Sequence, residues 1–400
     1  MTVWTKVFKM LGTKFSDWPN YSDAEIDAVT RVLRSNKVNY WTGQECRAFE
    51  AEFAQWCGVS HAVSLTNGTV ALDLCWRVLG IGPGDEVVVT SRTFLASASS
   101  IITAGATPVF ADVDTDSQNI TPETVAAVLT PRTRAILCVH LAGWPCDMPA
   151  FEEFAKKHNL FLVEDCAQAH GAEINDRKVG SFGDIAAWSF CQDKIMTTGG
   201  EGGMITTNNR KLWDKAWSYK DHGKSWAAVY ERPHPPGFRW LHESFGTNWR
   251  MIEMQAVIGR IQLQRMAEWT KTRNAHSQKI WNAARSFGSL RVPVVPQSIL
   301  HACYKAYVFV RPDELAKGWS RDRIVKEIVA QGVPCFQGSC SEVYLEKAFA
   351  DHPSKPKERL SVAKQLGETS IMFLVHPTIS ENDMTHAADV LSGVFKSAAA

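Results

Sequence analysis

Three short groups of residues in this chain carry side chains that could act together in catalysis. Asn67-Gly68-Thr69 follows a short apolar run, Asp165 ends the run LFLVED, and Lys194 lies just before the glycine-rich segment GGEGG. Each group also has an ordinary structural explanation, namely a turn with a helix cap, a capping carboxylate and a solvated surface lysine. Their significance therefore depends on whether one chemistry needs all three.

Pyridoxal phosphate chemistry does need all three. A lysine amine can form a Schiff base with an aldehyde cofactor, and a carboxylate can keep a pyridine nitrogen protonated. The amides at a helix start, a glycine that allows close approach and a hydroxyl such as that of Thr69 or Ser189 can bind a phosphate. Pyridoxal phosphate carries an aldehyde, a pyridine nitrogen and a phosphate, so the three groups together predict a site for this cofactor.

Other nucleotide, hydrolase and metal signatures are missing or lie in the wrong context. Gly80, Gly82 and Gly84 resemble part of a dinucleotide-binding loop, but they precede a strand, whereas such a loop follows one. The sequence has no G-x-x-x-x-G-K-[ST] phosphate loop and no G-x-S-x-G elbow. No pair of histidines has the spacing of a zinc-binding helix, so we expect no metal site.

Length and composition fit a folded enzyme and argue against several other classes of protein. The chain has 400 residues, more than one hydrophobic core usually fills, and 45% of them are apolar. Its 43 basic and 42 acidic residues give a net charge of +1, so no basic field for nucleic acid is expected. No apolar stretch reaches the roughly 18 residues of a membrane span, so we expect no membrane partner.

The cysteines and the first residues indicate a cytoplasmic protein. The ten cysteines contain no C-x-x-C pair, and several lie in apolar runs, as Cys138 does in AILCVHL. This pattern is typical of thiols in a reducing compartment. The segment MTVWTKVFKMLGTKF has lysines between its apolar residues and lacks the apolar core of a signal peptide. Residues 1–18 are expected to form an N-terminal extension packed on the protein, with an amphipathic membrane anchor as the alternative.

Helical and strand patterns that could position these groups alternate from about residue 19. Ser22 begins a helical segment and Glu25 follows three positions later, the pattern of a capping box, while Gly58 and Gly80 end the next two helical segments. Short runs that are apolar throughout separate the helices, among them HAVSL, DEVVVTS and LFLVED. This alternation predicts a mainly parallel sheet covered by helices on both sides, with ligands at the strand ends.

The pattern changes after Asp165. Two strand-like runs, DIAAWSFC and GGMITTNN, are separated by a glycine-rich loop, and a polar, aromatic stretch follows from Tyr219 to about Asn248. Loops of this length usually have a function or contact a partner. One long helix is expected from Met251 to Gly288, followed by a smaller region of mixed helices and strands.

With these segments in order, the chain resembles the DegT family of sugar aminotransferases, which are pyridoxal-phosphate enzymes with the aspartate-aminotransferase fold (fold type I). The resemblance extends from about Asp23 to the C-terminus and is carried by TNGTVALDL, GIGPGDEVVVTSRTFLASASSI, VEDCAQAHGAE, GSFGDIAAWSF, DKIMTTGGEGGMITT and FGTNWRMIEMQAVIGRIQL. It implies an α/β large domain over 19–265, with a mainly parallel seven-stranded sheet between helices, and a smaller α+β C-terminal domain over 266–400.

The resemblance also implies roles for the cofactor residues. Lys194 would bind the cofactor covalently and act as general base and acid, and Asp165 would pair with the pyridine nitrogen. Some relatives carry histidine in place of this lysine and remove a hydroxyl, so Lys194 argues against that dehydratase branch. The remaining cofactor contacts would be Gln168 at the phenolic oxygen, Phe94 on the ring face, and Gly68, Thr69 and Ser189 at the phosphate.

A homodimer with shared active sites is implied as well. Asn248 corresponds to an asparagine that reaches the phosphate of the neighbouring subunit's cofactor, so the loop 219–248 would cross the interface. His222, Lys224 and Arg250 are the candidate substrate-binding residues, with Lys224 facing a diphosphate. Loop ordering by His222 and an ion pair of Arg250 with a carboxylate remain alternative explanations.

The expected reaction transfers an amino group from L-glutamate to a nucleotide-linked keto sugar, with an NDP-4-keto-6-deoxyhexose as the favoured substrate. The product would feed bacterial surface-polysaccharide synthesis, such as O-antigen, or glycosylated-metabolite synthesis. Arg92 and Ala142-Gly143-Trp144 depart from the family pattern at places expected to border the sugar pocket. Amination of a 3-keto nucleotide sugar or a keto-cyclitol therefore remains open. A non-catalytic sensor or regulator of the same fold is a further alternative, and it would be expected to have a broken cofactor site.

Overall fold

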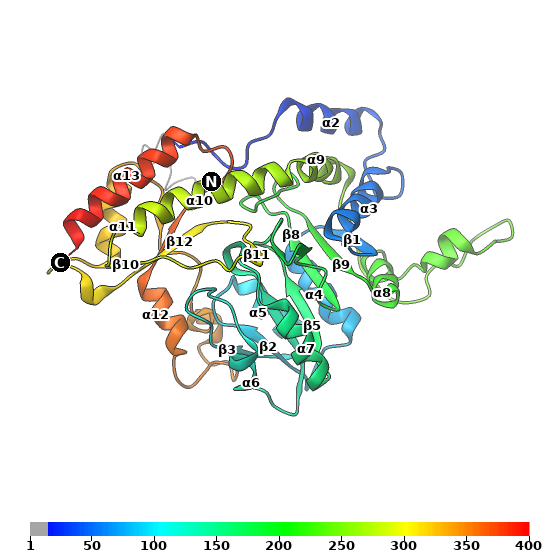
Figure 1. Ribbon diagram of the computed structural model, residues 1–400. Coiled ribbons are helices and arrows are strands. Elements are labelled where there is room, and N and C mark those ends of the chain that lie inside the picture. Colours follow the sequence, from blue (N-terminus) through cyan, green and yellow to red (C-terminus); the bar gives the residue numbers. More distant parts are fainter. Residues whose placement is uncertain (1–14, 400) are drawn as a thin grey trace.

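The architecture follows the alternation that the sequence predicts. The computed structural model describes residues 15–399, so most of the expected extension 1–18 lies outside the described residues. Figure 1 shows the C-terminal helices and strands gathered on one side of the molecule, while a segment after α8 extends away on the other side.

A seven-stranded sheet forms the centre of the large part of the chain. Its order is β1-β9-β8-β5-β4-β2-β3, and β9 runs antiparallel to both of its neighbours while the remaining pairs are parallel. The predicted fold class is thereby confirmed. The strands are β1 His61–Leu65, β2 Glu86–Thr90, β3 Thr107–Ala111, β4 Thr133–Val139, β5 Phe161–Asp165, β8 Ile185–Ser189 and β9 Gly203–Thr207.

The helices that surround this sheet begin and end at residues that the sequence marks. The Ser22 N–H donates to the Glu25 carboxylate at 2.9 Å at the start of the first described helix. Gly58 and Gly80 take left-handed conformations, with φ 77° and 72°, at two helix ends. The helices are α2 Asp23–Arg34, α3 Glu45–Cys57, α4 Gly68–Leu79, α5 Leu95–Thr103, α6 Pro122–Ala126, α7 Met148–His158 and α8 Arg210–Lys220.

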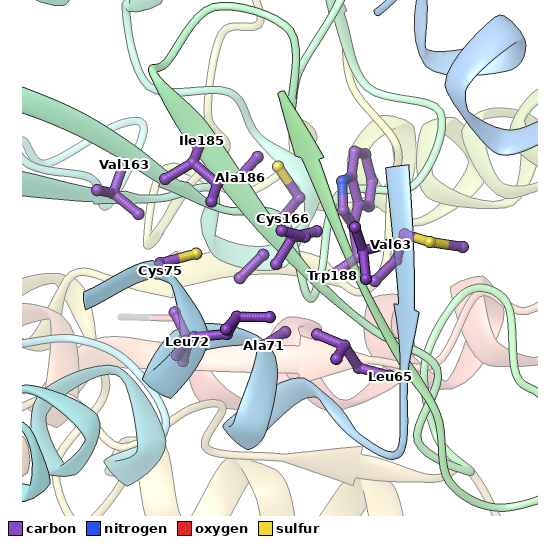
Figure 2. Packing of buried hydrophobic residues seen from close by; sticks show 14 of the residues in the cluster. Val63, Leu65, Ala71, Leu72, Cys75, Val163, Cys166, Ile185, Ala186 and Trp188 are labelled. Atoms are coloured by element: carbon purple, nitrogen blue, oxygen red, sulfur yellow. The ribbon is translucent and has the colours of Figure 1, made fainter. Parts of the chain in front are cut away.

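Helix α4 packs its apolar face directly on the central strands. Figure 2 shows Ala71, Leu72 and Cys75 of α4 facing side chains of β1, β5 and β8, among them Val63, Val163 and Trp188. The three α4 side chains are at most 4% exposed, so this contact contributes to the main hydrophobic core. The packing fixes where α4 begins, at the carboxyl edge of the sheet.

The C-terminal part has an antiparallel sheet of its own, in the order β10-β12-β14-β13. Along β12 the side chains alternate: Ala306, Val308 and Val310 enter the C-terminal core, while Tyr307 and Phe309 join a cluster with the large sheet. One face of this sheet therefore packs against the large part of the chain. The strands of the sheet are β10 Leu290–Arg291, β12 Ala306–Val310, β13 Cys335–Phe336 and β14 Ser370–Phe373, and the helices of the C-terminal part are α11 Arg321–Ala330, α12 Ser361–Thr369 and α13 Glu381–Ala398.

A third, three-stranded sheet and several short helical turns complete the fold. The small sheet has the order β11-β6-β7, with β6 Glu173–Ile174, β7 Arg177–Lys178 and β11 Ile299–Leu300. The turns are η1 Leu141–Gly143, η2 Ala227–Glu231, η3 Pro312–Glu314, η4 Val343–Leu345 and η5 Lys347–Phe349.

The single long helix expected over 251–288 was wrong. Two helices, α9 Glu253–Gln264 and α10 Met266–Ala284, meet at Arg265, whose backbone (φ −91°, ψ −6°) stays in the right-handed region but departs from regular helical values. The Arg265 guanidinium donates to the Glu25 carboxylate of α2 at 2.9 Å. A tertiary contact thus accompanies the break, and no proline or glycine in the sequence signals it. The division of the chain into 1–18, 19–265 and 266–400 stays a prediction.

Two further observations concern the thiols and the helices. All ten cysteines are free, and eight of them are buried. Among residues 15–399, no helix has both the length and the apolar composition needed to cross a membrane.

Candidate active site

The loops that carry the candidate residues leave the same edge of the central sheet. Because β1, β2, β4, β5 and β8 run in one direction, their carboxyl ends meet there. Leu65 of β1 and Ser189 of β8 both pair with Gly203, and Asp165 of β5 pairs with Ala187 of β8. The register therefore places the end of β5, the end of β8 and the start of α4 around one spot.

Asp165 is a buried carboxylate with neutral partners. It is 5% exposed, and it accepts hydrogen bonds from the Ser97 hydroxyl at 2.8 Å and the Ala167 N–H at 3.1 Å. It forms no ion pair with a lysine, arginine or histidine of residues 15–399. Burial of an unpaired carboxylate is unfavourable, so this donor set suits a ligand that brings a positive charge, such as a protonated ring nitrogen.

Ser97 is a functional candidate that the sequence did not reveal. Its hydroxyl lies 2.8 Å from that of Thr93, and both residues are 1% exposed. Ser97 lies in the first turn of α5 and thus joins that helix to the end of β5. The run LASASS contains several hydroxyls, and nothing in it marks which one faces a carboxylate.

The start of α4 and the end of β8 approach each other too closely for a side chain at Gly68. A Cβ atom on Gly68 would lie 2.5 Å from the Ser189 Cβ and 2.9 Å from its Oγ. Asn67 caps the helix by accepting the Val70 N–H at 3.0 Å, and the N–H groups of Gly68 and Thr69 belong to the first turn, which has no intrahelical acceptors. These amides and the Ser189 hydroxyl fit a phosphate group.

Lys194 lies beside an aromatic ring and an acidic residue. Its ammonium is 5.5 Å from the centroid of the Tyr304 ring, and the Tyr304 hydroxyl donates to Asp193 at 2.6 Å. Burial opposes ionisation of Asp193, but the Lys194 charge and the Tyr304 hydrogen bond outweigh it and lower the pKa of that carboxyl. The Lys194 carbonyl accepts the Trp18 indole N–H at 2.7 Å, which fixes the backbone of the loop.

Gln168 and Phe94 complete the set of predicted cofactor residues. The Gln168 side-chain oxygen accepts the Ala142 N–H at 2.8 Å, which leaves the amide nitrogen as the free donor of this side chain among residues 15–399. Phe94 precedes α5 and is 68% exposed, unusually high for a large apolar ring, so its face is available for stacking. The roles of both residues stay predictions.

His140, Glu164 and Cys166 form a buried group that has the composition of a metal site. Their ligand atoms lie within 4.8 Å of one another, but those of His140 and Glu164 already have protein partners. His140 accepts the Cys146 N–H at 3.0 Å through Nδ1 and faces Glu164 through Nε2 at 3.1 Å. The two Glu164 oxygens also accept three backbone N–H groups, those of Gly180, Phe182 and Gly183. The group therefore serves the fold.

The predicted substrate residues cluster around Asp221, which is fully buried. One Asp221 oxygen accepts from Lys224 at 3.0 Å and from Arg250 at 2.7 Å. Lys224 also lies 4.1 Å from the Trp41 ring, so its charge is already compensated. His222 is exposed with φ 59°, and within residues 15–399 no hydrogen bond or ion pair joins any of these three candidate residues to Lys194 or Asp165. Their substrate roles stay predictions.

Asn248 and Arg92 occupy different environments. Asn248 is exposed and pairs with Asp221 in a short bridge, and the adjacent Trp249 carbonyl accepts the Thr66 N–H at 3.0 Å, two residues before Gly68. Arg92 is fully buried and donates to Gln118 at 3.0 Å and to Ser370 at 3.2 Å. Arg92 therefore links the segment after β2 to the C-terminal sheet, and its place at the sugar pocket stays a prediction.

Comparison with known proteins identifies relatives along nearly the whole chain. The model of the DegT/DnrJ/EryC1/StrS aminotransferase family matches residues 19–392. A UDP-N-acetyl-3-dehydro-alpha-D-glucosamine 3-aminotransferase of Acidithiobacillus ferrooxidans is 36% identical over 370 residues, 92% of this chain and 93% of the relative. GDP-perosamine synthase of Caulobacter vibrioides is 36% identical over 385 residues, 94% and 96% of the two chains.

A solved structure agrees with the fold in detail. The X-ray structure of an aminotransferase from Psychrobacter cryohalolentis is 61% identical and superposes with a TM-score of 0.95 over 96% of this chain and 99% of that one.

The close approach of Gly68 to Ser189 predicts a sensitive position. Gly68→Ala places a methyl group 2.5 Å from the Ser189 Cβ, and overpacking of this kind costs roughly 1–3 kcal/mol. We expect the affinity for pyridoxal phosphate to fall by about tenfold or more, measured by absorbance titration of the cofactor-free protein. Gly82→Ala is the matched control, because its Cβ would meet only the Ala104 carbonyl at 3.6 Å. Equal affinities in the two variants would contradict the assignment of the phosphate site.

Proposed function

We propose that this chain, which belongs to the DegT/DnrJ/EryC1/StrS aminotransferase family, transfers an amino group from L-glutamate to a nucleotide-linked keto sugar. The chain is a pyridoxal-phosphate-dependent aminotransferase, and the favoured acceptor is an NDP-4-keto-6-deoxyhexose. The observation that carries the proposal is the joint placement of Asp165, Ser189 and the α4 start at one sheet edge in a chain matched over 19–392. The presence of Lys194, Asp165 and Thr69 also argues against a non-catalytic regulator.

Different residues are proposed to bind the cofactor and to transfer the proton. Asp165, held by Ser97, would pair with the ring nitrogen, and the α4 start with Ser189 would bind the phosphate. Gln168 would face the phenolic oxygen, Phe94 would cover the ring face, and Lys194 would move the proton at the substrate carbon. When bound, pyridoxal phosphate supplies an electron sink for the negative charge that develops at that carbon.

A 3-keto acceptor is the second candidate. The relative from Acidithiobacillus ferrooxidans is named as a 3-aminotransferase, and it is as similar to this chain as the GDP-perosamine synthase. Both acceptors are nucleotide-linked keto sugars, so the two candidates differ only in the carbon that receives the amine. The product would feed surface-polysaccharide synthesis, such as O-antigen, or glycosylated-metabolite synthesis.

The enzyme is further proposed to act as a cytoplasmic homodimer with shared sites. The segment after α8 carries aromatic side chains that are far more exposed than apolar rings usually are, namely Phe238 at 76%, Trp240 at 81% and Phe245 at 98%. Burial of these rings against a second copy of the chain would remove that exposure. The free, mostly buried thiols support a reducing compartment.

The acceptor is tested by an amination screen. Purified enzyme with L-glutamate should convert an NDP-4-keto-6-deoxyhexose to the amino sugar, detected by mass spectrometry with the carbon assigned by NMR. Lys194→Ala serves as the inactive control. Conversion of a 3-keto sugar alone would establish the second candidate, and amination of a free keto-cyclitol but of no nucleotide sugar would refute the proposal.

The shared site is tested by mixing inactive chains. Lys194→Ala and Asn248→Ala homodimers should each lack activity, and heterodimers should regain part of it, since one site then has Lys194 from one chain and Asn248 from the other. Mixing Lys194→Ala with Asp165→Ala is the matched control and should give no recovery, because both residues belong to the same chain's contribution. Absence of recovery in the first mixture would count against a shared site.

A further inference from the structure

Two lysine ammonium groups lie around one aromatic ring at the candidate site. The Tyr304 ring centroid is 5.5 Å from the Lys194 ammonium and 4.5 Å from that of Lys305, which directly precedes β12. Lys305 is partly exposed, and its ammonium has no hydrogen bond or ion pair within residues 15–399. Lys194 has an assigned role toward the cofactor, whereas Lys305 has none.

A third cation, Arg273, lies next to the Tyr304 backbone. Arg273 of α10 is 1% exposed, and its Nε and Nη2 have no hydrogen-bond partner in the described part of the chain. Its Nη1 donates to the Tyr304 carbonyl at 3.5 Å, and the guanidinium lies 5.1 Å from the Trp18 ring centroid. Burial without a counter-ion lowers the pKa of Arg273 to about 10, which still leaves it charged at neutral pH.

In the part of the chain that the structure describes, the groups around these cations do not balance their charges. Asp193 is the acidic group that interacts with Lys194 and Lys305, and its carboxylate also accepts the Tyr304 hydroxyl. Burial, reinforced by nearby cations, lowers the pKa of His170 to about 3 and that of His376 to about 2, so both are neutral. Burial also lowers the pKa of Lys305 to about 8; Asp193 opposes this shift, while Arg273 and Lys194 add to it. With Lys194 bonded to the cofactor as proposed, Lys305 and Arg273 still outnumber Asp193, so this cluster keeps excess positive charge at neutral pH.

Excess positive charge at this position favours one anion above others. In glutamate the α-carboxylate is bonded to the same carbon as the amine, so an amine at the reacting atom brings its carboxylate close to Lys194. In a 4-keto sugar nucleotide the diphosphate lies across the sugar ring from the reacting carbonyl and would lie further away. The cofactor phosphate has a separate proposed binding site at Gly68 and Ser189, so it is not the anion that this cluster would bind.

We infer that Lys305 binds a carboxylate of the amino donor, and that Arg273 is a positioning residue whose charge favours the anion without contacting it. The inference rests on the proposed function, because it takes an amino acid as donor. Backbone bonds hold this part of the chain in place: the Ala302 and Tyr304 N–H groups donate to the Gly143 and Ala142 carbonyls, each at 2.9 Å. Lys305 thus follows a segment fixed against the loop that Gln168 also contacts.

The test uses glutarate, a dicarboxylate that cannot donate an amine, with the cofactor-loaded protein. Isothermal titration calorimetry should show Lys305→Met binding glutarate at least about tenfold more weakly than the unchanged protein, the loss expected for one charge-assisted hydrogen bond. Lys305→Arg keeps the charge and should stay within about threefold. Lys317→Met, at an exposed lysine before α11, is the control and should bind as the unchanged protein does.

A second measurement separates this inference from the proposed function. The cofactor absorbance during the half reaction with L-glutamate alone reports the donor step, and Lys305→Met should raise the glutamate concentration at half-maximal rate while the KM for the sugar nucleotide stays unchanged. If the unchanged protein reacts with glutamate and Lys305→Met matches it, the inference on Lys305 is wrong. A selective rise in the sugar-nucleotide KM overturns it in favour of the diphosphate. If the unchanged protein neither reacts with glutamate nor binds glutarate, the donor assignment and this inference both fail.

Discussion

The carboxylate of Asp165 is buried with only neutral hydrogen-bond donors around it, and the candidate site is organised around this charge. Its neighbour in the same strand, Glu164, points to the opposite face of the sheet and is also buried. Glu164 accepts three backbone N–H groups and faces His140, so the fold itself satisfies that charge. Two adjacent carboxylates thus differ in their partners: Glu164 holds loops together, whereas Asp165 has only neutral donors, which is why we propose that it binds a ligand with a positive charge.

The rest of the fold positions groups around that carboxylate. The packing of α4 on the sheet sets the start of α4 against Ser189, and only glycine fits at position 68. The C-terminal sheet also helps to position these groups, because Tyr307 and Phe309 of β12 pack against the large part of the chain. The segment before β12 places the Tyr304 ring near the ammonium groups of both Lys194 and Lys305. Both parts of the chain therefore supply charged residues to the candidate site.

The sequence predicted what depends on local patterns. Helix ends at Gly58 and Gly80, the strand ending at Asp165 and the helix start at Gly68 all follow from short-range signals. The break at Arg265 and the pairing of Asp193 with Tyr304 could not be predicted, because each depends on residues far apart in the chain, 111 positions in the second case. The ion pair of Lys224 with Asp221 was not predicted either, and the substrate role of Lys224 stays a prediction.

The most direct test of the account locates the covalent cofactor bond. Borohydride makes the bond between a lysine and pyridoxal phosphate permanent, and peptide mass spectrometry then identifies the modified residue. We expect the cofactor on Lys194 and no trapped cofactor in Lys194→Ala. Cofactor trapped on Lys305, or retained on the chain after Lys194→Ala, would contradict it.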